Sequence, residues 1–293
     1  REGLEYNLRV QDLRVVAPID YLVIGHLTRD RLAQGMRLGG TVAYSGLTAA
    51  AFGFRTAAVT ACSCDEELAE LRGIQAVRLA SERTTVFENL YQGGVRRQRV
   101  ESVAARLPEA AIPATWRRPR LVHLAPVAGE VDPSLLDLFP DSFRGVTPQG
   151  WMRTWDAGGQ VSPQRTPQAE TAAGKASAQV FSLEDTGGDE GWIAHLVELC
   201  AITAVTEGRA GCRVYWNGHI RHLAAPAVEE IDSTGAGDIF AAAFFIRLLE
   251  TRDPWDAGRL ANQVAAASVG RPGLRGVPTP QEVAASKRVV AAR

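Results

Sequence analysis

The sequence predicts an α/β protein with a mostly parallel central sheet that helices cover on both faces. Short apolar runs of strand length alternate with helical patterns along most of the chain, which is typical of such sheets. The 293 residues are 46% hydrophobic and 22% charged, which is enough to bury one large core. We therefore expect residues 1–293 to form a single domain.

The expected elements follow one another in this alternating order. Apolar runs predict strands over 21–25, 55–61, 121–124, 145–147, 179–182, 201–206 and 212–216. Helical patterns cover 42–52, 189–199, 236–249, 255–268 and a short segment after Pro280. Gly53 marks the end of the first helix, because glycine readily adopts the left-handed conformation that often follows a helix.

Two segments break the alternation. Residues 84–100 contain two strand patterns around Gly93-Gly94, and this polar ribbon predicts a flap that projects from the main sheet. An ordinary edge hairpin fits the same pattern. Residues 155–178 are rich in Gly, Gln, Thr, Pro and Ala with little periodicity, so we expect a surface excursion with at most a short helix.

The composition disfavours several classes of protein. The net charge of −1 leaves no basic surplus for a polyanion, so nucleic acid is not an expected partner. No apolar run is long enough for a transmembrane helix and no signal pattern opens the sequence, so no membrane partner is expected. The four cysteines are too few and too irregularly spaced for a secreted disulfide framework, which favours a cytoplasmic location.

The most informative segment runs from Asp232 to Asp238, with the sequence D-S-T-G-A-G-D, and an apolar run follows it. Gly235 and Gly237 bracket Ala236 where a helix should begin, so backbone N–H groups can converge on an anion. Asp238 would lie in the first helical turn. The pattern predicts a phosphate-binding turn with a carboxylate beside it, although Asp and Gly are also ordinary turn and cap residues.

The spacing D-x-T-G-A-G-D-x-F resembles the C-terminal signature of the PfkB carbohydrate kinase family, the ribokinase-like kinases. This resemblance implies a three-layer α-β-α fold with a small β lid from about 31–38 and 84–101. It also implies an ATP-dependent, Mg²⁺-assisted phosphotransferase that acts on an alcohol group of a small sugar or polyol. In that role the backbone of Gly235, Ala236 and Gly237 would stabilise the moving phosphoryl group, and Asp238 would be the general base.

Residues that match the acceptor side of the family occur earlier in the chain. Asp30 follows the first strand, where these kinases place a substrate-binding aspartate; a plain surface Asp is the alternative. Tyr44 stands where ribokinase has Asn, which argues against ribose as the substrate. Arg153 is the nearest candidate for the Arg that follows D-P-N in many sugar-acid kinases. The implied substrate-binding residues are Asp30, Gly39, Gly40, Tyr44, Phe87, Asn89 and Arg153.

The nucleotide side matches less closely. Asp185 falls where the family has the Glu of N-x-x-E, which implies that it organises water around Mg²⁺, with Glu184 as the rival acid. Residues 206–211 resemble T-x-G-x-x-G, although a tight turn before a strand gives the same letters. The implied nucleotide-binding residues are Ser182, Thr206, Gly208, Gly211 and Asn262. For Asn262, a place on the helix surface is an equal alternative.

Two further features follow from the resemblance. Asp232 and Thr234 match positions that help hold a monovalent cation such as K⁺ in several family members, although strand-end and cap roles fit them equally. Lids of this type often pair between subunits, so a homodimer through the lid is expected. The alternatives are a nucleoside kinase of the same fold and a non-catalytic sugar or nucleotide sensor. A sensor has no need of a base beside a phosphate-binding turn, which favours the kinase.

Overall fold

A nine-stranded sheet forms the centre of the computed structural model, which describes residues 18–32, 35–66, 68–92 and 95–292. The strand order is β15-β14-β13-β12-β9-β8-β1-β4-β5. Neighbouring strands from β5 to β13 are parallel, whereas β14 and β15 are antiparallel. The strands are β1 (Tyr21–Ile24), β4 (Thr56–Ser63), β5 (Ile74–Ser81), β8 (Leu121–Leu124), β9 (Phe143–Val146), β12 (Ala178–Ser182), β13 (Ile202–Thr206), β14 (Cys212–Trp216) and β15 (His219–Leu223).

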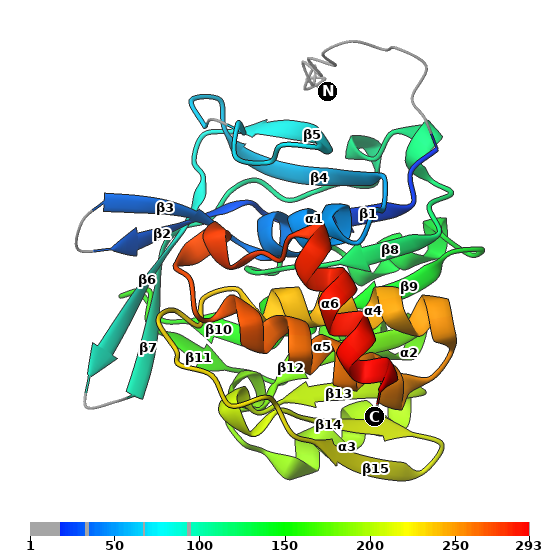
Figure 1. The fold of residues 1–293 in the computed structure, drawn as a ribbon. Helices are drawn as coiled ribbons and strands as arrows, with labels where there is room; N and C mark the ends of the chain where they lie inside the picture. Colours follow the sequence, from blue (N-terminus) through cyan, green and yellow to red (C-terminus); the bar gives the residue numbers. More distant parts are fainter. Residues whose placement is uncertain (1–17, 33–34, 67, 93–94, 293) are drawn as a thin grey trace.

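Helices cover both faces of this sheet (Figure 1). On one face lie α1 (Thr41–Ala51), α4 (Ala236–Thr251) and α5 (Pro254–Ser268), with α6 (Pro280–Ala291) packed on α5. On the other face lie α2 (Pro167–Lys175) and α3 (Glu190–Leu199). Strand β1 shows the period of two that this arrangement needs: Tyr21 and Val23 pack with α1 and α4, whereas Leu22 and Ile24 join the opposite core.

A separate four-stranded sheet, which we call the lid, projects from the side of the molecule (Figure 1). Its order is β3-β2-β6-β7. The strands are β2 (Thr28–Leu32), β3 (Gly35–Gly39), β6 (Thr85–Gln92) and β7 (Val95–Ser102). A small hairpin of β10 (Arg153–Trp155) and β11 (Val161–Pro163) meets the lid through a bridge between Arg99 and Gln160.

Short 3-10 helices connect many of these elements within the described residues. They are η1 (Glu109–Ala111), η2 (Ala114–Trp116), η3 (Pro133–Leu138), η4 (Pro148–Trp151), η5 (Leu183–Thr186), η6 (Gly208–Ala210) and η7 (Gly273–Gly276). Of these, η4 ends shortly before Arg153, and η5 contains Asp185.

The predicted fold class is confirmed: three layers, a mostly parallel sheet and a small β lid. The prediction for 155–178 is partly wrong: the segment contains one short helix, α2, as expected, but Ala169, Ala172 and Ala173 of this helix are fully buried in the core and not at the surface. Three alanines give too weak an apolar pattern to predict burial. The signal that was missed is the start of the helix, where the Thr166 side chain accepts from the Ala169 N–H and Pro167 follows. The Gly93-Gly94 turn of the predicted hairpin lies outside the described residues.

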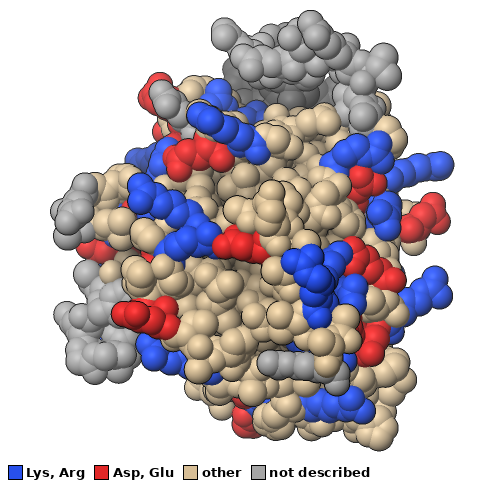
Figure 2. All heavy atoms as spheres, viewed as in Figure 1, with Lys and Arg blue, Asp and Glu red and all other residues tan. Residues whose placement is uncertain are grey.

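The surface shows mixed charge. On the face viewed in Figure 2, basic and acidic side chains are interspersed, in keeping with the net charge of −1. Among the helices of the described residues, none has both the length and the apolar character that crossing a bilayer requires.

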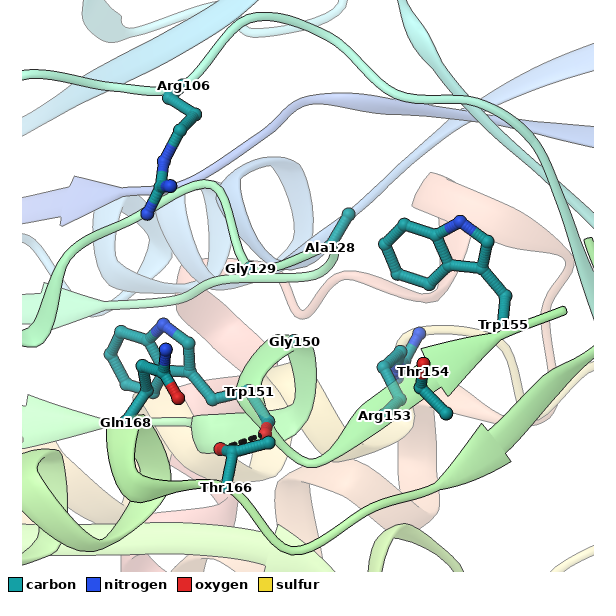
Figure 3. Close-up of a pocket in the computed structure, with 10 residues that line it drawn as sticks. All are labelled: Arg106, Ala128, Gly129, Gly150, Trp151, Arg153, Thr154, Trp155, Thr166 and Gln168. Carbon is teal, nitrogen blue, oxygen red and sulfur yellow. Dashed lines mark hydrogen bonds between the residues drawn. The ribbon is translucent and has the colours of Figure 1, made fainter.

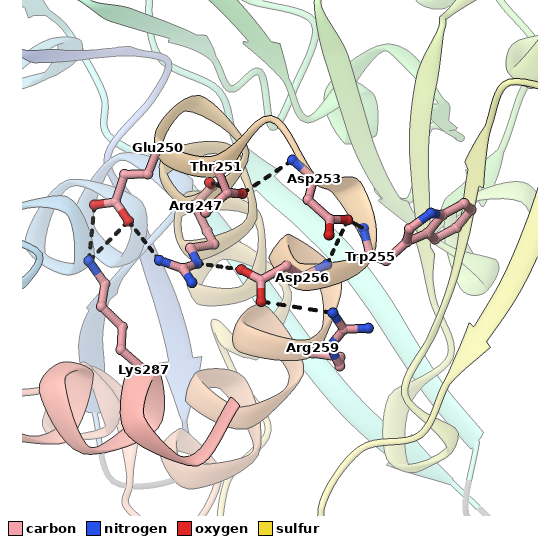
Figure 4. Close-up of polar contacts among 8 residues, drawn as sticks. All are labelled: Arg247, Glu250, Thr251, Asp253, Trp255, Asp256, Arg259 and Lys287. Atoms are coloured by element: carbon pink, nitrogen blue, oxygen red, sulfur yellow. Dashed lines mark hydrogen bonds and ion pairs between the residues drawn. The ribbon is translucent and has the colours of Figure 1, made fainter. Parts of the chain in front are cut away.

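Ion pairs tie the three helices α4, α5 and α6 together (Figure 4). Arg247 of α4 donates to Asp256 of α5 at 2.5 Å, and Lys287 of α6 donates to Glu250 of α4 at 3.0 Å. The start of α5 is fixed by Asp253, whose carboxylate accepts the Trp255 and Asp256 N–H groups at 2.8 and 3.1 Å. These contacts hold α5 against α4, the helix that begins in the D-S-T-G-A-G-D segment.

We expect Asp253→Ala to lower the free energy of unfolding by roughly 1 kcal/mol, because the first turn of α5 would lose its cap. Urea unfolding followed by circular dichroism measures this loss. Asp253→Asn is the matched control, since its side-chain oxygen can still accept, and it should stay close to the wild type. An Asp253→Ala variant as stable as the wild type would show that the cap is unimportant.

Candidate active site

The turn before α4 depends on the absence of a side chain at Gly235. This residue has a left-handed φ of 80°, and a Cβ placed on it would lie 2.3 Å from the ring of Tyr44. No other residue type fits both the backbone conformation and the contact. Tyr44 of α1 is only 1% exposed, so it forms the wall behind this turn instead of facing open space.

The turn presents backbone donors toward open space. The N–H groups of Gly235, Gly237 and Asp238 make no hydrogen bond to an acceptor of the described residues, whereas that of Ala236 donates to the Ser233 carbonyl at 3.2 Å. A Cβ at Gly237 would meet nothing within 4 Å. Unpaired N–H groups at the start of a helix attract anions, and the helix dipole adds to this attraction.

Asp238 lies in the first turn of α4 and faces α1. Its carboxylate accepts from the Thr41 hydroxyl at 2.7 Å, and its carbonyl accepts from Ser45 at 2.9 Å. Burial raises the pKa of Asp238 to about 6, and the negative charges of Asp185 and Asp30 add to this rise. The hydrogen bond from Thr41 acts in the opposite direction. A carboxylate with this pKa can accept a proton near neutral pH and release it again.

The predicted acceptor residues share one face of the lid. Asp30 of β2 pairs in register with Phe87 of β6, and Asn89 lies two residues further along the same strand. Asp30 is 6% exposed, and a Cβ at Gly39 would lie 2.6 Å from its carboxylate oxygen. Gly39 therefore makes room for the Asp30 side chain. Gly40 precedes α1 with a φ of 89°.

A polar chain leads from the lid to the predicted nucleotide side. Gln98 donates to Asn89 at 3.1 Å and accepts from Arg153 at 2.9 Å. The Arg153 guanidinium is 5.6 Å from the centre of the Phe87 ring and 3.9 Å from an oxygen of Asp185. Arg153 thus lies between a lid face and a carboxylate of the central sheet, and its charge favours the ionised form of Asp238.

Asp185 follows the carboxyl end of β12 and is held firmly in place. Its carboxylate accepts from the Ser182 N–H at 2.8 Å and from the Gln149 amide at 3.0 Å, while the Ser182 hydroxyl accepts from the Asp185 N–H at 3.1 Å. Thr206 pairs in register with Ser182 at the end of the neighbouring strand β13. These residues therefore meet at one edge of the sheet, where parallel α/β sheets commonly bind ligands.

The remaining predicted nucleotide residues differ in their surroundings. Gly208 and Gly211 have φ values of 58° and 101°, and a Cβ at Gly211 would lie 2.1 Å from the Leu223 carbonyl. Asn262 is 4% exposed, and its amide donates to the same carbonyl at 2.7 Å. Asn262 therefore holds α5 against β15, and we do not include it in the candidate site.

Asp232 and Thr234 do not fit a monovalent cation. Oxygen lone pairs are what such a hard cation requires, yet both side chains accept from the Arg37 guanidinium of β3, at 2.7 Å for Asp232 and 3.3 Å for Thr234. Asp232 also accepts from the Thr234 and Gly273 N–H groups at 3.0 and 2.9 Å. The prediction of a cation held by these two residues is therefore not supported by their contacts.

Arg153 also lines a cavity of about 220 Å³ (Figure 3). Arg106, Trp151 and Trp155 line it, and the Thr166 hydroxyl donates to the Trp151 carbonyl at its base. Neither Asp30 nor Asp238 borders this cavity. We place the candidate site at the carboxylates instead, because there a base, charged groups and unpaired N–H donors occur together.

Three contributing residues were not predicted from the sequence: Thr41, Gln98 and Arg37. Thr41 directly follows Gly39-Gly40, so a hydroxyl at the start of that helix was available as a signal. Gln98 and Arg37 act on residues that lie far away in the chain or on another strand. Their spacing in the sequence therefore carries no signal for these contacts.

Known proteins share parts of this sequence. Residues 180–281 match the profile of the pfkB family carbohydrate kinase. An inositol 3-kinase from Zea mays is 37% identical over 153 residues, which are 50% of this chain and 39% of that protein. A ribokinase from Bacillus subtilis is 42% identical over 82 residues, 27% of each chain. The matched stretches thus span less than two thirds of these curated relatives.

Solved structures share the fold over nearly the whole chain. A pyrophosphate-dependent kinase in the ribokinase family, complexed with a pyrophosphate analogue and myo-inositol, has a TM-score of 0.76 at 21% identity. That match covers 91% of this chain and 99% of the other. Arabidopsis thaliana ribokinase, complexed with ribose and ATP, has a TM-score of 0.68 at 15% identity over 93% and 99% of the two chains. Residues 180–281 are therefore similar to the pfkB family of carbohydrate kinases, and the described chain has the fold of these solved structures.

Proposed function

We propose that this protein is a kinase that transfers a terminal phosphoryl group to a hydroxyl of a small polyol or sugar. The observation that carries the proposal is the position of Asp238, a carboxylate with a pKa of about 6 beside unpaired N–H groups at the start of α4. Phosphoryl transfer to an alcohol needs a proton acceptor and donors for the moving charge at one place. Both are local to this turn.

In the proposed reaction, the acceptor oxygen attacks the terminal phosphorus as the bond from that phosphorus to the leaving oxygen breaks. The hydroxyl proton passes to the Asp238 carboxylate, which later returns it to solvent. The N–H groups of Gly235 and Gly237 stabilise the charge on the transferred group. The N–H of Ala236 contributes less, because it already donates to Ser233.

We propose ATP with Mg²⁺ as the donor. Mg²⁺ on the donor phosphates would neutralise part of their charge. Asp185 would bind a water molecule of the Mg²⁺ shell and not the ion itself. Each of its carboxylate oxygens accepts one hydrogen bond from the protein and retains a second lone pair for that water. Ser182, Thr206, Gly208 and Gly211 would border the nucleotide. Pyrophosphate is the second donor to test. Asn262, the residue implied beside adenine, instead donates its amide to the Leu223 carbonyl inside the protein, so no adenine contact is proposed for it.

A cyclitol such as myo-inositol is our first choice of acceptor. Asp30 supplies a carboxylate that can accept from adjacent hydroxyls, and Asn89 and Arg153 supply polar groups from the lid side. The similarity to inositol 3-kinase over half of this chain supports the same class. Tyr44, in contrast, supports the turn from behind and is not an acceptor contact in this proposal. The homodimer through the lid stays a prediction.

We expect the wild type to phosphorylate at least one member of a panel of inositols, pentoses, hexoses, sugar acids and nucleosides, with ATP or pyrophosphate. Asp238→Asn should reduce kcat by about 10²–10⁴-fold, because the hydroxyl proton loses its acceptor. Product formation measured by ³¹P NMR checks both. Activity confined to nucleosides would favour a nucleoside kinase, and ligand binding without any turnover would favour a sensor.

The same substitution gives a stability control. Because the pKa of Asp238 is raised from 3.8 to about 6, the free energy of unfolding falls as the pH rises between these two values, and the full cost of the ionised carboxylate is present above pH 6. Asp238→Asn should therefore match or exceed the Tm of the wild type above that pH. A lower Tm would mean that lost activity reflects misfolding.

The pH profile of kcat/KM should rise with pH through about 6, because the free enzyme must have Asp238 ionised. Thr41→Val removes a hydrogen bond to the ionised form, so the acid limb should move to higher pH. Thr41→Ser keeps the hydroxyl and is the matched control. An unchanged limb in Thr41→Val would indicate that another group controls the profile.

We expect Gly237→Ala to fold normally but to lose about 10²-fold in kcat/KM, an effect comparable to the loss of one transition-state donor. Apart from its chain neighbours and the backbone of α4, a methyl group there meets no atom of the described residues within 4 Å, and it would occupy the space proposed for the phosphoryl group. Gly174→Ala in α2, also with nothing within 4 Å, is the matched control. Both changes should raise stability by up to about 1 kcal/mol as helical Gly→Ala substitutions. Full activity in Gly237→Ala would contradict the proposal that the phosphoryl group binds against Gly237.

A further inference from the structure

Arg37 joins the lid to the turn that precedes α4. It lies on β3, and its guanidinium donates to Asp232 at 2.7 Å and to the Thr234 hydroxyl at 3.3 Å. The side chain is 24% exposed, and its Nε is buried without a hydrogen-bond partner in the described residues. The contact spans 195 positions in the sequence.

A third segment completes this contact. Gly273 of η7 donates its N–H to Asp232 at 2.9 Å, and a Cβ on it would lie 2.8 Å from Cδ of Arg37. Gly273 also has a left-handed φ of 55°. The stem of Arg37 therefore lies directly against a backbone that only glycine fits well.

The charges at Asp232 are already balanced by these contacts. One carboxylate oxygen accepts from the Thr234 N–H, and the other accepts from Gly273 and Arg37. An alkali cation at this place would have to compete with these donors for the carboxylate oxygens. It would also be repelled by the guanidinium charge a few ångströms away.

We propose that the Arg37 guanidinium replaces a monovalent cation beside the phosphate-binding turn, so that the protein works without K⁺. Arg37 is then a positioning residue: through Asp232 and Thr234 it fixes the turn that directs the Gly235 and Gly237 N–H groups. Because Arg37 belongs to the lid sheet, the position of the lid and the shape of the turn are coupled. The expected effect of Arg37 on kcat rests on the proposed kinase function. Its expected effect on the stability of the turn does not.

The test compares KCl with tetramethylammonium chloride at equal ionic strength, using Tm and kcat as separate readouts. The wild type should have the same Tm and the same kcat in both salts. Arg37→Ala should have a lower Tm and about 10²-fold lower kcat in tetramethylammonium, as expected when reacting groups are misplaced. K⁺ should raise both values in this variant, because the exposed oxygens of Asp232 and Thr234 can then bind it.

Matched variants identify the cause. Arg37→Ala combined with Asp232→Asn should lose the K⁺ effect, since the carboxylate is gone. Arg37→Lys keeps the charge and should stay independent of K⁺. Arg31→Ala removes another lid arginine, one that pairs with Glu101 and not with the turn, and should show no K⁺ effect.

Two results would overturn the proposal: a K⁺-specific rise of Tm or kcat in the wild type, or an Arg37→Ala protein that K⁺ changes in neither readout. If Arg37→Ala does not fold, the wild type and Arg37→Lys still test the proposal. A K⁺-specific rise of Tm or kcat in either protein would contradict it. If no acceptor is phosphorylated, the Tm comparison still tests Arg37, so the proposed function and this inference can fail separately.

Discussion

The contact between the starts of α1 and α4 is the constraint on which the candidate site depends. The ring of Tyr44 occupies the space that a side chain at Gly235 would need, and Thr41 donates to Asp238 across the same junction. The helix that follows the acceptor residues Gly39 and Gly40 therefore also supports the phosphate-binding turn. Any change in the packing of the two helices alters the base and its N–H groups together.

Electrostatics explains how so many carboxylates coexist at this edge of the sheet. Burial raises the pKa of Asp238, the negative charges of Asp185 and Asp30 add to this rise, and Asp232 lies a few residues away. Two arginines offset this charge, Arg153 beside Asp185 and Arg37 on Asp232. Both arginines also contact lid strands, directly or through Gln98. A movement of the lid would therefore also shift the two arginines that offset the carboxylate charge in the site.

The sequence predicted what depends on local pattern. The D-S-T-G-A-G-D turn, the strand ends near Asp185 and Thr206, and the parallel sheet all follow from neighbouring residues. Contacts between distant segments were not predictable, because Arg37 and Asp232 have no shared spacing that reveals their pairing. The same reason explains Asn262, where the sequence does not show which face of α5 meets β15. The burial of helix α2 was missed because three alanines are a weak signal for a core position.

In the proposed reaction, Asp238 lies between a bound acceptor and the donor phosphate. A crystal structure with a non-hydrolysable ATP analogue, Mg²⁺ and myo-inositol tests it most directly. We expect an acceptor hydroxyl about 2.6–3.2 Å from the Asp238 carboxylate, with the terminal phosphate against the N–H groups of Gly235 and Gly237. An acceptor bound instead in the cavity of Arg106 and Trp151, with no hydroxyl near Asp238, would contradict it.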